Sequence, residues 1–168
     1  MLKPSLSKHI PVLLILLIFL TMTSTYAQIY NTYTAFKFVF PVGEASDYYQ
    51  NGWGVSGTSN FTIIPKFDLL FEASWYNLSG KKIHIPDQGS FQIENLSVLG
   101  LSLGAGYNLG ICQVGIKGGY FFDDLHEWDL VPYAQVLFWR LAAGIDYKGM
   151  LGNKKIRSVA IYLAYRWW

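Results

Sequence analysis

The chain is short of charge, of cysteine and of long apolar segments. Only 14% of its 168 residues are charged, whereas an ordinary globular domain has roughly 25%. Cys112 is the single cysteine, so the chain can form neither an internal disulfide nor a cysteine-rich metal site. After residue 22 no apolar run approaches the roughly 18 residues that a membrane-spanning helix needs. These shortages exclude a disulfide-stapled domain and a bundle of transmembrane helices.

Apolar and aromatic side chains are abundant instead. Hydrophobic residues make up 52% of the chain and aromatic residues 17%. Beyond the N-terminal segment they are spread out in alternation with small or polar residues. In lipid, backbone polar groups must be satisfied by other backbone groups, so only helices and closed barrels span a membrane. A length of 168 residues suits one domain, and the composition therefore predicts a single membrane β-barrel.

The N-terminus has the parts of a secretory signal peptide. Two lysines precede an apolar core at 10–20, and small residues lead to a cleavage site before Gln28. We expect residues 1–27 to be removed and residues 28–168 to form the barrel; the alternative is an uncleaved membrane anchor. Cleavage reduces the 13 basic residues to 11, which equals the 11 acidic ones. Because the mature net charge is then formally zero, no nucleic-acid partner is expected.

The stretch 158–168, SVAIYLAYRWW, carries the clearest strand signal. One parity is bulky and apolar or aromatic throughout: Val159, Ile161, Leu163, Tyr165 and Trp167. The other is smaller and includes a charge: Ala160, Tyr162, Ala164 and Arg166. A period of two indicates a strand with two different faces. An exposed apolar edge strand invites aggregation, so we expect this strand to close a barrel, with Tyr165 and Trp167 at the membrane–water interface.

Similar alternation recurs along the chain and predicts about eight strands. They are expected at 34–41, 52–62, 67–76, 96–109, 111–122, 130–139, 141–148 and 158–168. The register of 130–139 stays open because both parities are apolar, and Pro132 weakens it as a central strand. The stretches 77–95 and 122–129 are expected to be loops. Long and short connections then alternate, as in outer-membrane barrels with short periplasmic turns and long outer loops.

The two strand faces differ in a way that decides which one points outward. A lipocalin-like binder would turn its bulky apolar face inward around a ligand. Here the second face consists of small residues and single charges, with glycines at 100, 104, 106, 115 and 119. An eight-stranded barrel has interior room only for the side chains that fill it. We therefore predict an all-β, eight-stranded antiparallel up-and-down transmembrane barrel, with its bulky face toward lipid.

With this alternation, loop rhythm, signal peptide and terminal LAYRWW, the chain resembles the small outer-membrane β-barrel proteins of Gram-negative bacteria, the OmpA/OmpX-like group. It is similar to the short "outer membrane protein beta-barrel" proteins of that group. The resemblance implies location in the cell outer membrane. It also implies that a terminal aromatic in strand register serves as the signal read by the barrel-assembly machinery. Tyr165, Trp167 and Trp168 are the matching residues.

Four charged residues lie on the inward parity, near the middle of alternate predicted strands. They are Lys37, Glu72, Lys117 and Asp146. Two cations and two anions at similar depth can neutralise one another, and buried charges need such partners. We expect a lumenal charge network that fills the barrel; a polar relay or gate is the alternative.

Two further groups of residues fall in the long loops. Cations are expected at the outer rim, where they could contact lipid phosphates or serve solubility: Lys81, Lys82, Lys148, Lys154, Lys155 and Arg157. His84 and His126 also lie in loops, the latter beside several carboxylates. A loop metal site or a lipid-modifying active site is conceivable there, but solvated loop charge is the expectation.

Together these features predict an outer-membrane barrel with a structural or surface-interaction role and a closed, side-chain-filled lumen. We expect no catalytic residues, no cofactor and no metal. The expected partners are outer-membrane lipid and, during biogenesis, the assembly machinery, and the protein is expected to be a monomer. A narrow passive pore and an outer-membrane lipid-modifying enzyme are the alternatives.

Overall fold

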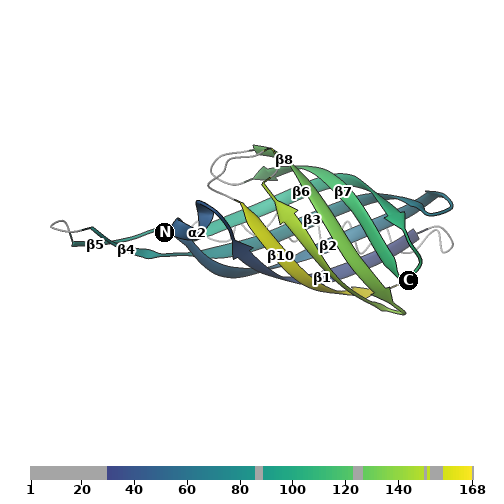
Figure 1. Cartoon of the computed structure of the whole chain (residues 1–168), viewed down its shortest axis with the longest axis horizontal. Helices are drawn as coiled ribbons and strands as arrows, with labels where there is room; N and C mark the ends of the chain where they lie inside the picture. Colours follow the sequence, from purple (N-terminus) through teal and green to yellow (C-terminus); the bar gives the residue numbers. More distant parts are fainter. Residues whose placement is uncertain (1–29, 86–88, 123–126, 150, 152–156, 168) are drawn as a thin grey trace, which may run out of the picture.

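Eight antiparallel strands close into a barrel in the order β1-β10-β9-β8-β7-β6-β3-β2 (Figure 1). The structure is a computed structural model that describes residues 30–85, 89–122, 127–149, 151 and 157–167. The barrel strands are β1 Tyr30–Pro41, β2 Tyr49–Ile64, β3 Phe67–Gly80, β6 Leu96–Asn108, β7 Cys112–Phe122, β8 Glu127–Phe138, β9 Leu141–Lys148 and β10 Ser158–Arg166. The predicted all-β, eight-stranded up-and-down barrel is confirmed. The expected signal peptide, residues 1–27, lies outside the described residues.

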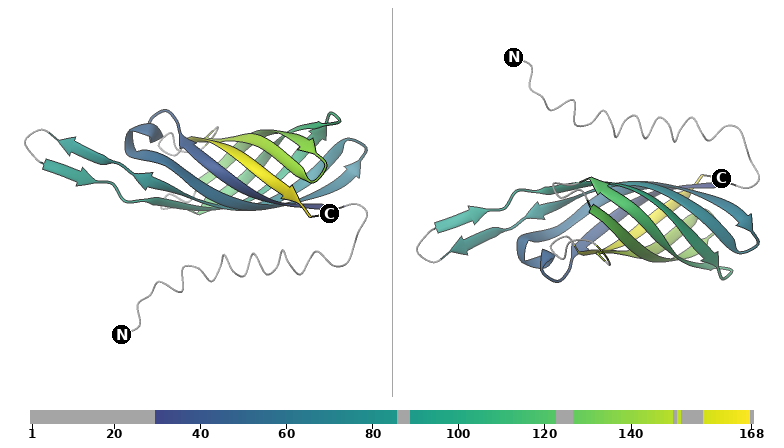
Figure 2. Two further views of the ribbon diagram at one scale, coloured as in Figure 1. Left: turned by 90° about the horizontal axis from the view of Figure 1, so that it is seen from below. Right: turned by 90° about the horizontal axis from the view of Figure 1, so that it is seen from above.

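Closure occurs between the first and the last strand of the barrel. β1 and β10 pair antiparallel, from Tyr33 opposite Arg166 to Pro41 opposite Ser158. This pairing satisfies the backbone groups that either strand would otherwise expose as an edge. The two views in Figure 2 show the wall continuing around the molecule.

Side chains alternate across the wall as the sequence pattern predicts. On β1, Phe36 and Phe38 are 43% and 56% exposed on the outer face, whereas Lys37 and Val39 between them are 5% and 2% exposed in the lumen. β8, whose register the sequence left open, turns Asp129, Val131, Tyr133 and Gln135 inward. The lumen is therefore a core of side chains, and the outer surface is predominantly apolar.

One end of the barrel carries short turns and the other carries long connections. A four-residue helix, α2 (Ala45–Tyr48), lies between β1 and β2. The stretch 77–95, predicted as a loop, instead extends β3 to Gly80 and then forms a hairpin of β4 (Lys82–Ile85) and β5 (Gly89–Gln92). This hairpin projects beyond the barrel at the long-loop end (Figure 1). Each of its strands is only four residues long, too short for alternation to be recognised in the sequence.

Among the described residues, no helix is long and apolar enough to cross a membrane.

The prediction of an acidic loop over 122–129 is wrong at both ends of the stretch. Phe122 still belongs to β7, and β8 already begins at Glu127. Pro132 lies inside β8, opposite Ile116 of β7. The pairing of β8 with β9 starts only at Tyr133, one residue later. A proline is tolerated here because the ladder that would need its missing N–H does not extend to it.

Candidate functional site

The four predicted lumenal charges meet inside the barrel. Lys37 lies on β1, Asp146 on β9, Lys117 on β7 and Glu72 on β3, which are alternate strands around the closed sheet. The sign of the charge therefore alternates around the lumen, and each cation faces two anions. We call these four side chains the charge ring.

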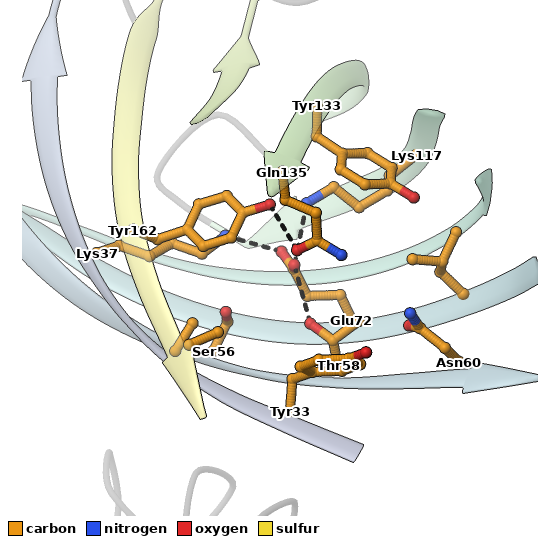
Figure 3. A pocket seen from close by; sticks show the side chains of 13 residues that line it. Tyr33, Lys37, Ser56, Thr58, Asn60, Glu72, Lys117, Tyr133, Gln135 and Tyr162 are labelled. Atoms are coloured by element: carbon orange, nitrogen blue, oxygen red, sulfur yellow. Dashed lines mark hydrogen bonds and ion pairs between the residues drawn. The ribbon is translucent and has the colours of Figure 1, made fainter. Parts of the chain in front are cut away.

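Each lysine of the charge ring contacts both carboxylates. Lys37 Nζ lies 3.0 Å from Glu72 Oε1 and 2.9 Å from Asp146 Oδ2. Lys117 Nζ lies 3.0 Å from Glu72 Oε2 and 3.4 Å from Asp146 Oδ2. Figure 3 shows Glu72 between the two ammonium groups. The four side chains are 4% to 9% exposed, so the ring is withdrawn from bulk water.

The surroundings of the charge ring complete its polar contacts. Thr58 Oγ1 donates to Glu72 Oε2 at 3.3 Å. Lys37 Nζ lies 5.5 Å from the centre of the Tyr162 ring, and Lys117 Nζ lies 5.2 Å from that of Tyr133. Cations over aromatic faces are stabilised by the ring quadrupole. An isolated buried ion would be very costly, but here every charge has two opposite charges, so the arrangement suits neutralisation and packing.

On the loop side of the charge ring the lumen holds a cluster of apolar side chains, with the buried polar residues Lys148, Ser74, Ser102 and Ser158 beside it. The members of this cluster are Val39, Tyr76, Leu78, Leu96, Val98, Phe121, Val131 and Ala160. We call them the apolar plug. Leu78 and Val98 are completely buried, and the remaining members are 2% to 7% exposed. A void of about 20 Å³ remains between this layer and the charge ring, lined by Lys37, Glu72 and Asp146 of the ring and by Val39, Tyr76 and Phe121 of the plug.

On the turn side of the charge ring the lumen is polar. Asp68 accepts hydrogen bonds from Thr62 Oγ1 at 2.7 Å, Asn108 Nδ2 at 2.8 Å and Gln113 Nε2 at 2.7 Å. Gln113 in turn accepts from Gln135 Nε2 at 2.5 Å, and Tyr162 OH donates to Gln135 Oε1 at 3.2 Å. Sequence reasoning placed Asp68 and Gln113 on the inward parity but did not single them out. Their polar type on that parity was the available signal.

Two voids of about 20 Å³ each lie in the lumen among the described residues, and each has room for roughly one water molecule. One void, on the turn side, is lined by Ser56, Asn60 and Tyr133 together with Lys37 and Glu72 (Figure 3). Among the described residues, Ser56 Oγ, Asn60 Oδ1 and Tyr133 OH find no hydrogen-bond partner. A void with that lining suits a buried water, because buried polar groups are normally satisfied.

The loop-side mouth of the barrel is organised by a residue that the sequence prediction assigned to a loop. Asp129 is 2% exposed. Its Oδ1 accepts from the N–H of Leu130 at 2.8 Å and of Leu151 at 2.9 Å, and its Oδ2 accepts from the N–H of Gly149. This carboxylate therefore holds the start of the β9–β10 connection against β8.

The cations predicted at the outer rim do not form one surface cluster. Lys148, expected there, is instead 4% exposed inside the barrel, 3.5 Å from Glu127 Oε1 and 4.3 Å from the centre of the Phe121 ring. Lys81 Nζ donates to the carbonyl of Ser46 at 2.5 Å, which ties the hairpin to α2. Among the described rim cations, Lys82 is exposed, and Lys81 and Arg157 are partly exposed. Lys154 and Lys155 lie outside the described residues.

The two loop histidines do not come together with other candidate ligands in the part of the chain that the structure describes. His84 is exposed on β4, opposite Ser90 of β5. No group of three or more histidine, cysteine and acidic side chains suited to a metal occurs among the described residues. His126 lies outside those residues, so the site considered for it is not described.

The predicted assembly-signal residues lie at the turn end of β10. Tyr165 and Trp167 are 38% and 51% exposed on the outer face, with ring centroids 5.1 Å apart. Trp167 Nε1 donates to Thr34 Oγ1 at 2.9 Å, and its backbone N–H donates to the carbonyl of Thr32 at 2.9 Å. Trp167 thus extends the contact between the last strand and the first. Trp168 lies outside the described residues.

Comparison with known proteins adds little to this picture. No protein-family model matches the chain, and no curated protein matches its sequence. Among solved structures, the chain is similar to one described as "De novo design of transmembrane beta-barrels", with 16% sequence identity and a TM-score of 0.47. That match covers 84% of this chain and 98% of the other.

Proposed function

We propose that the protein is an integral β-barrel of the Gram-negative outer membrane, with a structural or surface-interaction role. The observation that carries this proposal is the apolar outer face of a closed barrel. Bulky apolar side chains there remain exposed around the whole wall, for example Phe38 at 56%, Leu103 at 59%, Val136 at 49% and Ile161 at 52%. In water such a surface would drive aggregation, whereas a bilayer accommodates it.

The proposed orientation places the short turns toward the periplasm and the long connections outside the cell. This assignment follows the loop rhythm of outer-membrane barrels. It puts α2 and the β4–β5 hairpin on the cell surface. On the hairpin, Phe91 is 64% exposed. The position of the hairpin beyond the barrel (Figure 1) supports a surface-interaction role.

The lumen is proposed to be closed to solutes. Two features support closure: the apolar plug, and the charge ring with its saturated ion pairs. The voids of about 20 Å³ are too small for a hydrated ion or a nutrient. We propose a non-catalytic role on the same basis, because the carboxylates and lysines of the lumen are engaged with one another.

Three measurements on the full chain test the proposal. Expression in a Gram-negative host should give a heat-modifiable band in the outer-membrane fraction; recovery as a soluble periplasmic protein would refute the membrane location. Purified barrel in a planar bilayer should carry no steady current, and a reproducible conductance would favour the narrow pore. Lipid mass spectra of a deletion strain should match those of the parent, and a missing lipid modification would favour the enzyme.

A further inference from the structure

The short-turn end of the barrel differs chemically from an ordinary set of solvent-exposed turns. Its tips carry bulky apolar residues with the largest exposed fractions in this region: Ile63 67%, Leu109 60%, Ile111 71%, Phe138 78% and Trp139 78%. The exposed charged side chains at this end, among the described residues, are Lys66 and Arg140, which are both cations. Apolar tips with cations between them suit the headgroup layer of a membrane, where aromatic residues and basic residues anchor proteins.

A groove on the outer wall opens at this same end. It has a volume of about 580 Å³ and crosses the closure of the barrel, between β2, β1, β10 and β9. Its lining is almost wholly apolar and includes Phe36, Val55, Leu141, Leu163, Tyr165 and Trp167. Thr34, an exposed residue of the lining, is smaller than the apolar side chains around it. A flexible hydrocarbon chain has the shape and the low polarity that fit such a groove.

Polar hydrogen-bond donors stand at the turn-side mouth of the groove. Arg140 Nη1 donates to Tyr165 OH at 3.3 Å, and the guanidinium lies 5.5 Å from the centre of the Trp139 ring. No carboxylate of the described residues lies within salt-bridge distance of Arg140. Within the part of the chain that the structure describes, the hydroxyl proton of Tyr165 and the remaining N–H groups of Arg140 are therefore available to a ligand. A planar guanidinium beside a hydroxyl donor matches the oxygens of a phosphate.

We propose that this groove binds one phospholipid, with an acyl chain along the apolar floor and the phosphate between Arg140 and Tyr165. The three chemical parts of the site, an apolar groove, a cation and a phenol at its mouth, fit an amphipathic anion. A phospholipid in that position bridges β9, β10 and β1, and it therefore covers the seam at which the barrel closes. The proposal rests on the membrane location proposed above, since that location supplies the lipid.

Native mass spectrometry of the full chain, released from detergent micelles, tests the site. With added dioleoylphosphatidylglycerol we expect one retained lipid per barrel. Arg140→Gln removes the cation and should lower retention roughly tenfold, the equivalent of one charged hydrogen bond. Val55→Trp fills the groove and should lower retention by about the same factor, because the acyl chain then loses apolar contact area. Lys66→Gln and Val114→Trp are matched controls, because they change an exposed turn cation and an outward valine away from the groove. Both controls should retain lipid as the unchanged protein does.

Three outcomes would overturn the site: equal loss in the four variants, no loss in Arg140→Gln and Val55→Trp, or no retained lipid in the unchanged protein. A comparison that needs no variant uses dioleoylglycerol, which has the same chains but no phosphate. If dioleoylglycerol were retained as well as the phospholipid, Arg140 and Tyr165 would have no role in binding. The heat-modifiable band in the membrane fraction is scored in parallel. A barrel that inserts normally but selects no lipid contradicts the site alone, whereas a chain that is absent from the membrane contradicts the proposed function.

Discussion

At the level of single residues, Glu72 is one of the two carboxylates that both lysines of the charge ring contact. Sequence reasoning could place Glu72 in the lumen but could not decide whether Lys37 or Lys117 is its partner. The structure assigns both, at 3.0 Å each. Parity fixes which face a side chain takes, but the choice of partner depends on strand tilt and register, which no local pattern specifies.

Replacing Glu72 by Ala should lower the free energy of unfolding by roughly 3–5 kcal/mol, because two buried ammonium groups would then share one carboxylate. Combining Glu72→Ala with Lys117→Ala should cost less than the two single changes added, with a coupling of about 0.5–3 kcal/mol. The same should hold with Lys37→Ala. Urea unfolding in detergent micelles measures each value, and Lys66→Ala, an exposed turn residue, is the control. Strict additivity with both lysines would contradict the charge ring.

Glycines on the inward parity make room for the lumenal tyrosines. A Cβ added to Gly144 would lie 2.5 Å from the Tyr162 ring, whereas one added to Gly118 would meet its nearest atom at 3.5 Å, on Leu130. Gly144→Ala should therefore destabilise the barrel by about 1–3 kcal/mol through overpacking, and Gly118→Ala should be nearly neutral. Thermal unfolding of the two variants, followed by the heat-modifiable gel shift, tests this difference. Equal tolerance at both positions would mean that the lumen repacks freely.

At the level of elements, the sequence was most informative where the two faces of a strand differ most. The bounds of β9, Leu141–Lys148, agree with the prediction. β8 was ambiguous because its inward face carries Val131 and Tyr133 beside Asp129 and Gln135. Val131 belongs to the apolar plug. Where the inward face of a strand is apolar like the outward face, the two parities look alike in the sequence, so alternation does not reveal the register. The β4–β5 hairpin was missed because each of its strands is only four residues long, which is too short to show a period of two.

We expect the pairing of β1 with β10 to depend on Trp167 more than on the other exposed tryptophans of the chain. Its indole N–H reaches Thr34 on β1 at 2.9 Å, which ties β10 to β1 beyond their last paired residues. Trp167→Ala should reduce the fraction of folded, heat-modifiable barrel in the membrane severalfold, because a hydrogen bond worth about 1 kcal/mol and an interfacial aromatic are both lost. Trp139→Ala is the control, since Trp139 is 78% exposed on a turn. Equal assembly of both variants would count against a special role for Trp167.

For the whole molecule, the layers of the lumen decide which part keeps it closed. A void of about 20 Å³ lies beside the charge ring on each side, but the hydrogen-bonded network of Asp68, Gln113 and Gln135 is on the turn side. The loop side is the apolar plug, in which Leu78 and Val98 have no exposed surface. Because narrow apolar constrictions block ions by excluding water, the plug rather than the ring should be the seal.

Planar-bilayer recordings separate these two roles. The variant with Leu78→Ser and Val98→Ser should give discrete ion currents, because smaller polar side chains let water cross the plug. Glu72→Gln should give none, since it disturbs the ring but leaves the plug packed. Leu103→Ser, on the outer face, controls for loosened packing against lipid. The heat-modifiable gel shift checks that each variant is folded. If the double variant unfolds, Leu78→Ser alone is used in its place. Currents through Glu72→Gln, with no current through the folded plug variant, would show that the charge ring is the barrier and that the plug is not.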